Sequence, residues 1–161
     1  MEYKAGIGYD IHRLVKGRKL FLGGIQIPHT KGLLGHSDAD VLLHAVCDAL
    51  LGAAGLADIG KHFPDTDKRY KNIRSTQLLK NVLKRIKRRG LEVVNLDATL
   101  VAEEPKMSVW RLNIQEQIAK QLGICKGSVN LKATTAEGLG DIGKKKAIAA
   151  WCVVLLRGKR K

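Results

Sequence analysis

The sequence has few aromatic residues, few prolines and no long apolar run, and these shortages exclude several classes of protein. Phe, Trp and Tyr make up 4% of the 161 residues, which argues against single-stranded nucleic acid stacking on exposed rings. No apolar run approaches the ~20 residues of a membrane-spanning helix. Because the first residues also lack the pattern of a secretory signal, we expect a cytoplasmic protein that contacts no membrane.

Cysteine is as scarce as proline, with three residues of each. Cys47, Cys125 and Cys152 form no C-x-x-C pair and lie in apolar stretches, so we expect reduced, buried thiols rather than disulfides. Neither a Pro- or Ser-rich linker nor an internal repeat divides the chain. We therefore expect a single domain over residues 1–161.

Positive charge is the one property in clear excess. Lys and Arg number 29 against 15 Asp and Glu, a net charge of +14, which favours anionic partners such as nucleic acid or phosphorylated ligands. Much of this excess falls in residues 76–89, 144–146 and 157–161. A basic RNA-binding module is therefore one hypothesis, and a charged surface that serves solubility and surface ion pairs is another.

Apolar periodicity and turn residues predict strands with interposed helices. Strands are expected at residues 2–9, 20–27, 91–102, 129–134 and 147–157, and helices at 38–52, 76–89 and 109–122. We expect Ser37 to be the N-cap of the first helix, Asp40 its capping-box acid, and Ser75 the cap of the second helix. The predicted fold is α/β (an α+β sandwich), with a small mixed sheet and helices packed on one face.

The first helix is apolar nearly all round, yet three polar residues interrupt it. Asp40, His44 and Asp48 are spaced four apart and stack on roughly one face of the helix. Burying a carboxylate or an imidazole without a partner costs several kcal/mol. The stripe therefore requires a metal ion, an internal hydrogen-bond network or a wet cleft.

A second polar pair ends the first strand. Asp10 and His12 are two residues apart, so both side chains point to the same face. With His44 they make three ligands, the number in a catalytic zinc site whose fourth position is open. Asp40 or Asp48 would then orient the outer nitrogen of His44. The alternative is that His44 is an ordinary core histidine, and the residues alone leave both interpretations open.

Two further clusters also have a chemical and a structural interpretation. The loop after the first helix carries Asp58, Gly60, His62, Asp65 and Asp67. Asp and Gly are also common turn residues. Residues 132–137 end a strand with threonine hydroxyls that can hold phosphate oxygens, and Glu137 can bind Mg²⁺ there. The alternative for this segment is an ordinary polar strand exit.

These clusters lie in segments that together resemble one known family. The segments are GYDIHR (8–13), GGIQIP (23–28), the block GLLGHSDADVLLHAVCDALLGAAGLADIGKHFPDTD (32–67), AEEPKM (102–107) and NLKATTAEGLG (130–140). In this order they resemble the family of 2-C-methyl-D-erythritol 2,4-cyclodiphosphate synthases. The resemblance spans nearly the whole chain.

The resemblance implies an assembly and a metal chemistry. It implies a homotrimer whose active sites lie between neighbouring subunits. It also implies that Asp10, His12 and His44 bind a divalent metal, usually Zn²⁺. Glu137 is implied to bind Mg²⁺ or Mn²⁺ together with the diphosphate of the substrate.

The resemblance further implies a substrate site with two portions. His36 and Thr135 match positions that stabilise the transition state. The methylerythritol phosphate portion is implied to contact Asp10, His12, His36, Ser37, Asp58, Gly60, Phe63, Asp65 and Asp67. The cytidine and phosphate portion, on the adjoining subunit, is implied to contact Ala102, Pro105, Lys106, Met107, Ala133, Thr134, Thr135 and Glu137.

The reaction that the resemblance implies is an intramolecular phosphoryl transfer in non-mevalonate isoprenoid biosynthesis. The 2-phosphate of 4-diphosphocytidyl-2-C-methyl-D-erythritol 2-phosphate attacks the β-phosphorus, CMP leaves, and the cyclodiphosphate forms, as a phosphorus–oxygen lyase would catalyse. A phosphate nucleophile needs positioning and charge neutralisation rather than a strong base. A metal-dependent phosphohydrolase is the alternative enzyme, because two-metal sites also activate water. The RNA-binding hypothesis leaves Asp10, His12 and His44 unexplained.

One segment departs from the pattern of the family. From Gly140 on the family usually reads G-F-T-G-R-G-E-G, whereas this chain reads GDIGKKKA. Asp141 stands in place of an aromatic residue and Lys144 in place of an arginine, and we expect both to line the substrate site. The proline expected shortly after Met107 is also missing, which predicts a local change in that loop.

Overall fold

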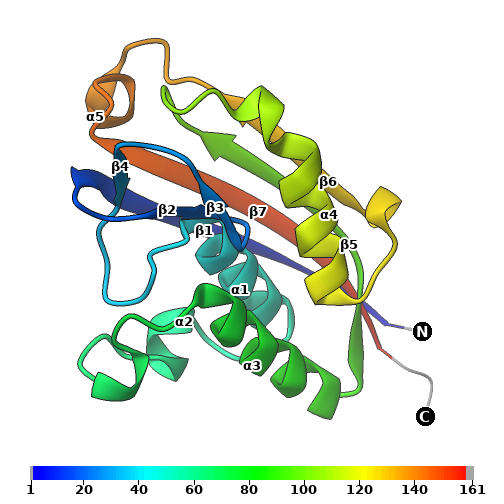
Figure 1. Ribbon diagram of the computed structural model, residues 1–161. Helices are drawn as coiled ribbons and strands as arrows, with labels where there is room; N and C mark the ends of the chain where they lie inside the picture. Colours follow the sequence, from blue (N-terminus) through cyan, green and yellow to red (C-terminus); the bar gives the residue numbers. More distant parts are fainter. Residues whose placement is uncertain (1, 159–161) are drawn as a thin grey trace.

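A five-stranded mixed sheet, covered on one face by helices, organises residues 2–158, the part of the chain that the computed structural model describes (Figure 1). The strand order is β4-β1-β7-β5-β6, in which β5 and β6 run parallel and the other neighbours antiparallel. The sheet strands are β1 (Tyr3–Lys16), β4 (Lys31–Leu33), β5 (Leu91–Val101), β6 (Val129–Thr134) and β7 (Ala147–Gly158). The predicted mixed sheet is confirmed, and the single domain over residues 1–161 stays a prediction.

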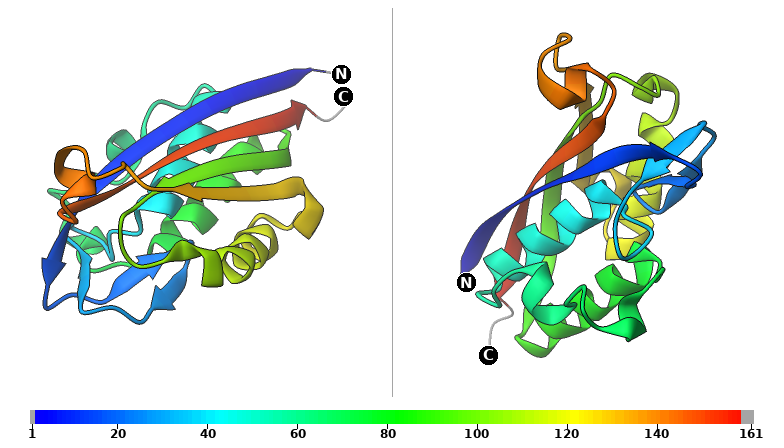
Figure 2. Two further views of the ribbon diagram at one scale, coloured as in Figure 1. Left: turned by 90° about the horizontal axis from the view of Figure 1, so that it is seen from above. Right: turned by 90° about the vertical axis from the view of Figure 1, so that its left-hand side faces the viewer.

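Three long helices pack on one face of this sheet, and short helical turns occupy the loops (Figures 1 and 2). The long helices are α1 (Val41–Ala53), α3 (Ser75–Arg88) and α4 (Arg111–Leu122). The short turns are α2 (Ile59–His62), η1 (Lys68–Tyr70), η2 (Met107–Val109), η3 (Lys126–Ser128) and α5 (Gly140–Gly143). Within residues 2–158, no helix is long and apolar enough to span a membrane.

Helix α1 packs so closely on β1 that two strand positions require glycine. A Cβ atom at Gly6 or Gly8 would lie 2.2 Å or 2.0 Å from a carbonyl oxygen of α1. Because side chains alternate along a strand, the next residues on this face, Asp10 and His12, also point toward the helix. The close packing therefore brings the polar end of β1 to the polar stripe of α1.

The predicted second strand is a hairpin of two short strands, β2 (Leu20–Leu22) and β3 (Ile25–Ile27). Its turn is formed by Gly23 and Gly24, both at positive φ. The carboxylate of Asp40 accepts hydrogen bonds from their backbone N–H groups, at 2.9 and 2.6 Å. The same carboxylate caps α1 by accepting from a backbone N–H three residues later, at 3.0 Å. Asp40 is thus the N-cap, and the prediction of Ser37 in that role is wrong.

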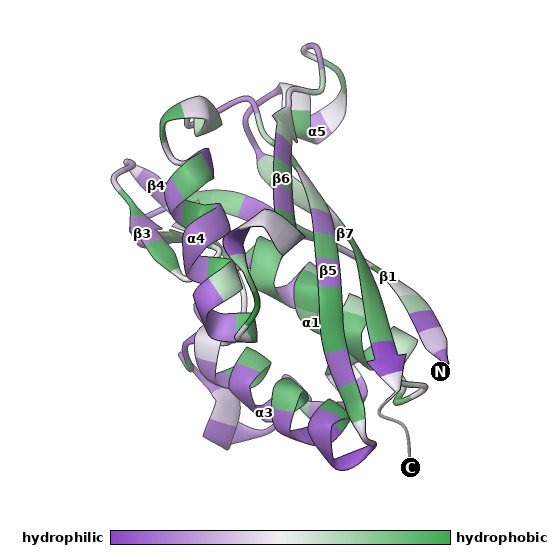
Figure 3. Cartoon of the chain, turned by 90° about the vertical axis from the view of Figure 1, so that its right-hand side faces the viewer, coloured by the Kyte–Doolittle hydropathy of each residue, from purple (hydrophilic) through white to green (hydrophobic). Residues whose placement is uncertain are grey.

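Helix α3 has an apolar side on the core and a cationic side in solvent (Figure 3). Its buried apolar residues are Leu78, Leu79, Val82 and Ile86, and its exposed cations are Lys80, Lys84, Arg85, Lys87 and Arg88. Ser75 is the first residue of the helix rather than its cap. Much of the predicted positive excess therefore lies on an exposed helical surface, while residues 159–161 of the basic tail lie outside the described residues.

The cysteine prediction is confirmed for two residues and wrong for the third. Cys47 and Cys152 are buried, whereas Cys125 is exposed, and all three are free thiols. Cys125 follows the end of α4 and precedes η3, so its apolar sequence neighbours do not place it in the core. Burial raises the pKa of the Cys47 thiol, which keeps this group protonated.

Helices cover one face of the sheet and leave the opposite face open (Figure 2). That open face carries large exposed apolar side chains. From β1 these are Tyr3, Ile7, Tyr9 and Ile11, and from β7 they are Trp151 and Val153, each at least 40% exposed. The strand pairing aligns them, because Tyr9 is opposite Trp151 and Ile7 is opposite Val153. Contiguous exposed apolar surface of this kind marks an interaction site in soluble proteins.

Candidate active site

Asp10 and His12 from β1 meet His44 from α1 in a compact triad. Asp10 Oδ2 lies 2.9 Å from His12 Nε2 and 2.9 Å from His44 Nδ1, and the two imidazole nitrogens are 3.0 Å apart. Ligands held at 2.0–2.1 Å in a tetrahedral zinc site lie ~3.3 Å from one another. The triad is therefore close to the spacing of three ligands around one small divalent cation, as the sequence predicted.

The Asp10 carboxylate has the charge that a metal ligand needs. Partial burial alone would raise its pKa, but hydrogen bonds from His12 and His44, and the positive charge on these rings, more than offset that effect. The net result is a pKa well below the usual range of an aspartate. Metal binding requires the deprotonated carboxylate, so this environment prepares Asp10 for the role.

The outer nitrogen of His44 is held by two serines. Nε2 lies 3.1 Å from Ser37 Oγ and 3.0 Å from Ser75 Oγ, and the Ser75 hydroxyl donates to Asp38 Oδ1 at 2.5 Å. Because Ser75 gives its proton to Asp38, its oxygen accepts from His44 Nε2–H. With a cation bound at the triad, this network would keep the proton on Nε2 and present Nδ1 to the metal.

This network corrects the prediction that Asp40 or Asp48 orients His44. Asp40 caps α1, and Asp48 Oδ1 accepts from the backbone N–H of Ile59 at 2.7 Å. Ser75 and Asp38, which sequence reasoning missed in this role, are the buried partners instead. Their sequence neighbours are mostly polar, so the sequence offered no local signal for this role.

A cavity of about 270 Å³ opens beside the triad. His12 and His44 line it together with five of the predicted site residues: His36, Ser37, Gly60, Phe63 and Asp65. Because the cavity opens onto two of the three triad side chains, a ligand bound there would reach the vacant side of a cation held by the triad. The structure therefore brings residues from the 32–67 block together as the sequence pattern predicted.

Two other predicted residues shape this cavity without lining it. Asp58 caps α2 by accepting from the Lys61 N–H at 2.9 Å, which lowers the pKa of its carboxyl. Asp67 caps η1 and pairs with Arg69, and this arginine lowers the pKa of Asp67. The backbone oxygen of Asp67 also contacts His36 Nε2 at 3.0 Å. Both aspartates thus fix the loop that surrounds the cavity.

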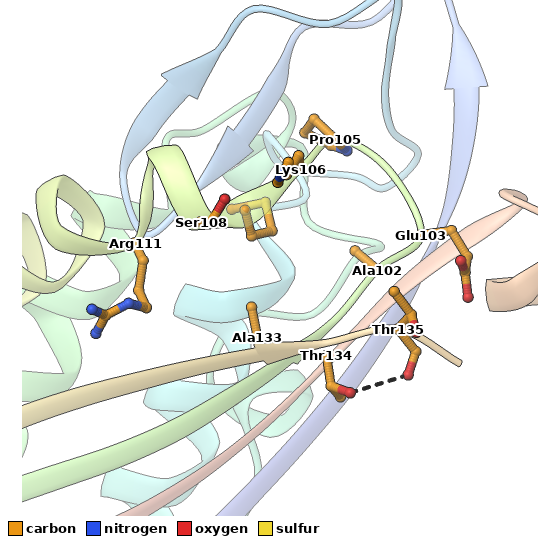
Figure 4. A pocket seen from close by; sticks show the side chains of 10 residues that line it. Ala102, Glu103, Pro105, Lys106, Ser108, Arg111, Ala133, Thr134 and Thr135 are labelled. Carbon is orange, nitrogen blue, oxygen red and sulfur yellow. Dashed lines mark hydrogen bonds between the residues drawn. The ribbon is translucent and has the colours of Figure 1, made fainter. Parts of the chain in front are cut away.

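A second cavity, of about 520 Å³, lies between residues 102–111 and the end of β6 (Figure 4). Its predicted lining residues are Ala102, Pro105, Lys106, Met107, Ala133, Thr134 and Thr135. Glu103, which lies in the matching segment 102–107, also lines it, as do Ser108 and Arg111, which sequence reasoning missed. Ser108 lies where the expected proline is missing, so the altered loop contributes directly to this cavity.

The three remaining predicted residues lie just beyond this second cavity or apart from it. Glu137 follows the end of β6, and its Oε1 accepts from the Thr135 hydroxyl at 2.8 Å. Asp141 lines a third cavity, of about 550 Å³, together with His12 and Lys146. Lys144 is the C-cap of the single-turn helix α5. Asp141 is therefore close to a triad residue, whereas Lys144 stays in the off-pattern loop.

Comparison with known proteins identifies the family of this fold and site. A sequence profile of the YgbB family matches residues 3–157. The chain belongs to the YgbB family. One YgbB-like relative, a protein from Desulfatibacillum aliphaticivorans named 2-C-methyl-D-erythritol 2,4-cyclodiphosphate synthase, is 61% identical over 153 residues, which cover 95% of this chain and 99% of the relative. The resemblance inferred from the sequence is confirmed.

Solved structures of YgbB relatives agree with the fold. A bifunctional IspDF protein from Campylobacter jejuni matches with a TM-score of 0.94 and 42% identity, over 98% of this chain and 43% of that longer chain. A 2C-methyl-D-erythritol-2,4-cyclodiphosphate synthase in a CDP-bound form matches with a TM-score of 0.89 and 36% identity, over 96% of this chain and 100% of that one. The described residues thus have the fold of YgbB proteins along nearly their whole length.

Proposed function

We propose that this YgbB protein converts 4-diphosphocytidyl-2-C-methyl-D-erythritol 2-phosphate to 2-C-methyl-D-erythritol 2,4-cyclodiphosphate and CMP, as a phosphorus–oxygen lyase of isoprenoid biosynthesis. The observation that carries the proposal is the triad of Asp10, His12 and His44 beside a cavity lined by His36 and Ser37. The name of its 61% identical relative supports the same reaction.

The donor sets of the two candidate metal sites differ and predict different ions. Asp10, His12 and His44 offer one oxygen and two nitrogens, a set that suits Zn²⁺. Glu137 offers a carboxylate oxygen, which suits Mg²⁺ or Mn²⁺ shared with substrate phosphates. When bound, such cations neutralise phosphate charge and polarise phosphoryl oxygens.

The side chains of the two cavities position the reacting groups. In the reaction the 2-phosphate oxygen bonds to the β-phosphorus while the bond from that phosphorus to the CMP oxygen breaks, so no water is consumed. His36 and Ser37 face the 2-phosphate end, and Lys106 and the Thr135 hydroxyl face the diphosphate end. Their donors hold both phosphates in line and stabilise the charge that develops in transfer.

The assembly that fits this chain is a homotrimer. Six large apolar side chains of β1 and β7 lie exposed on the open sheet face. Copies of this same face, brought together around a three-fold axis, would cover these side chains with chemically matched surface. The two cavities share no lining residue. Each active site then combines the triad cavity of one subunit with the second cavity of its neighbour.

The reaction is tested by its products. Purified protein incubated with the diphosphocytidyl substrate and Mg²⁺ is expected to release CMP in equal amount to a cyclic diphosphate, followed by chromatography and ³¹P NMR. A linear phosphorylated product would instead support the phosphohydrolase alternative. Tight RNA binding with no turnover of this substrate would support the RNA-binding module.

A further inference from the structure

Two adjacent glutamates, Glu103 and Glu104, follow β5 and make quite different contacts. Glu104 pairs with cations, since its carboxylate lies 2.9 Å from Lys31 Nζ and 3.5 Å from Lys145 Nζ. Among the ion pairs of residues 2–158, none joins Glu103 to a lysine, arginine or histidine. Its Oε1 instead accepts hydrogen bonds from the backbone N–H groups of Ala136 at 2.9 Å and Gly138 at 3.3 Å.

These two bonds join segments that are more than thirty residues apart in the sequence. Where β5 and β6 end, the Ala102 N–H donates to the Thr134 carbonyl at 3.0 Å. Glu103 extends this connection past the end of the sheet, to the turn at residues 136–138. Its side chain lies beside Thr135 at the edge of the second cavity (Figure 4).

The turn that Glu103 holds has an unfavourable backbone conformation. Glu137 has a φ of 51° and Gly138 a φ of 75°, and a left-handed conformation is energetically costly for a non-glycine residue such as Glu137. N–H groups gathered in such a turn form a concave site for an anion. Hydrogen bonds from them to a carboxylate are charge-assisted and strong, so Glu103 offsets the cost of the turn.

The turn also sets the geometry of two residues of the proposed active site. It brings the Glu137 carboxylate to the Thr135 hydroxyl, which donates to it at 2.8 Å. A negative side chain at the rim of a phosphate-binding cavity would weaken substrate binding through charge repulsion. The two backbone N–H groups that donate to Glu103 partly neutralise its charge, so Glu103 repels the phosphates less.

We propose that Glu103 is a positioning residue, whose carboxylate holds the turn at residues 136–138 so that the Thr135 hydroxyl and the Glu137 carboxylate face the diphosphate and its divalent cation together. The inference rests on the proposed function for the roles of Thr135 and Glu137. Glu103 itself touches neither the substrate nor the cation.

The test compares Glu103→Ala, which removes the acceptor, with Glu103→Gln, which keeps a carbonyl oxygen in its place. Substitution of residues that support metal ligands typically costs 10–100-fold in metal affinity. We expect Glu103→Ala to raise the half-saturating Mg²⁺ concentration for CMP release about 10-fold, with zinc content unchanged. Glu103→Gln is expected to restore most of the loss. Glu116→Ala is the matched control, because it removes an exposed ion pair between Glu116 on α4 and Lys126 on η3.

A second measurement does not depend on turnover. Amide hydrogen exchange in residues 135–139 is expected to be faster in Glu103→Ala than in the unmodified protein and in Glu103→Gln. Mn²⁺ binding in the presence of CDP, followed by EPR, is expected to be weaker in Glu103→Ala than in the unmodified protein and in Glu103→Gln. Wild-type Mn²⁺ affinity in Glu103→Ala would overturn the proposal, even if exchange were faster. If the unmodified protein released no CMP, the proposed function would fail, while the exchange and EPR results would still decide the role of Glu103.

Discussion

The two cavities of this protein are built in different ways. The triad side of the first cavity rests on regular elements, because β1 and α1 supply Asp10, His12 and His44, and buried Ser75 supports them from behind. Loop residues such as His36 and Asp65 line the rest of that cavity. The second cavity is formed mostly by loops between and after strands, and its residues are held by exposed or half-exposed carboxylates.

This difference indicates that the two cavities hold different kinds of ligand. A site on packed strands and helices keeps its ligands at fixed spacing and suits a resident cation. A site on loops can vary its contacts while its support stays fixed, which suits a nucleotide that arrives and leaves. Ser108, in the loop where the expected proline is missing, lines the loop-built cavity and not the triad cavity.

The largest expected effect is on the triad. His44→Ala is expected to remove the bound zinc and to lower CMP release by more than ~100-fold, above the range for residues that merely support ligands. Metal analysis of the purified variant and a turnover assay check this. His29→Ala, which changes a histidine outside the triad, is the control and is expected to keep its zinc. A zinc-free yet fully active His44→Ala would show that the triad is not the metal site.

A smaller effect is expected from the support behind the triad. Ser75→Ala removes the hydroxyl that joins His44 Nε2 to Asp38, so the ring loses its fixed tautomer and the buried carboxylate loses a donor. Zinc affinity is expected to fall about 10-fold, as measured by competition with a chelator. Ser128→Ala is the matched control. Unchanged zinc affinity in Ser75→Ala would mean that Ser37 alone orients His44.

The smallest effect concerns the loop-built cavity and depends on pH. The hydrogen bond and charge of Lys31 lower the pKa of Glu104 in the folded protein, so the folded state binds fewer protons at this carboxyl than the unfolded state. The stability it contributes is present above the unfolded pKa of about 4.3 and is lost as the pH falls through the lower folded value.

Glu104→Gln removes that contribution. We expect the variant to be less stable than the unmodified chain by up to ~1 kcal/mol at pH 7, with the difference smaller at pH 3 than at pH 7. Denaturant unfolding at both pH values measures it. A difference that stayed constant or grew on acidification would assign the effect to something other than this ion pair.

The sequence predicted the triad better than its support. The i, i+2 pair on a strand and the histidine on a buried helix each indicate a direction, but the joining of Asp10, His12 and His44 in one site came from the family resemblance rather than from the residues alone. The roles of Ser75 and Asp38 depend on where the start of α3 meets α1, which no local pattern encodes. Ser37 and Asp40 are both residue types that suit an N-cap. The hydrogen bonds from the β2–β3 turn to the Asp40 carboxylate, which favour Asp40, are visible only in the structure.

The loop-built cavity was predicted in its residues but not in its construction. The resemblance supplied Ala102, Lys106 and Thr135, and the structure brings them around one cavity. The bond from Glu103 to the turn at residues 136–138 joins two loops across the end of the sheet. Such a contact depends on loop geometry, which residue types alone do not determine.

The proposed active site combines the triad cavity of one subunit with the loop-built cavity of another, and mixing two inactive chains is the sharpest test of that arrangement. His44→Ala lacks the triad and Lys106→Ala lacks a cation of the second cavity. Each site of a symmetric trimer takes its triad from one chain and its second cavity from the neighbouring chain. When the two variants are co-expressed equally and assemble at random, about one site in four receives two intact halves. We therefore expect about a quarter of wild-type CMP release per chain. Activity no higher than that of either variant alone would contradict the claim.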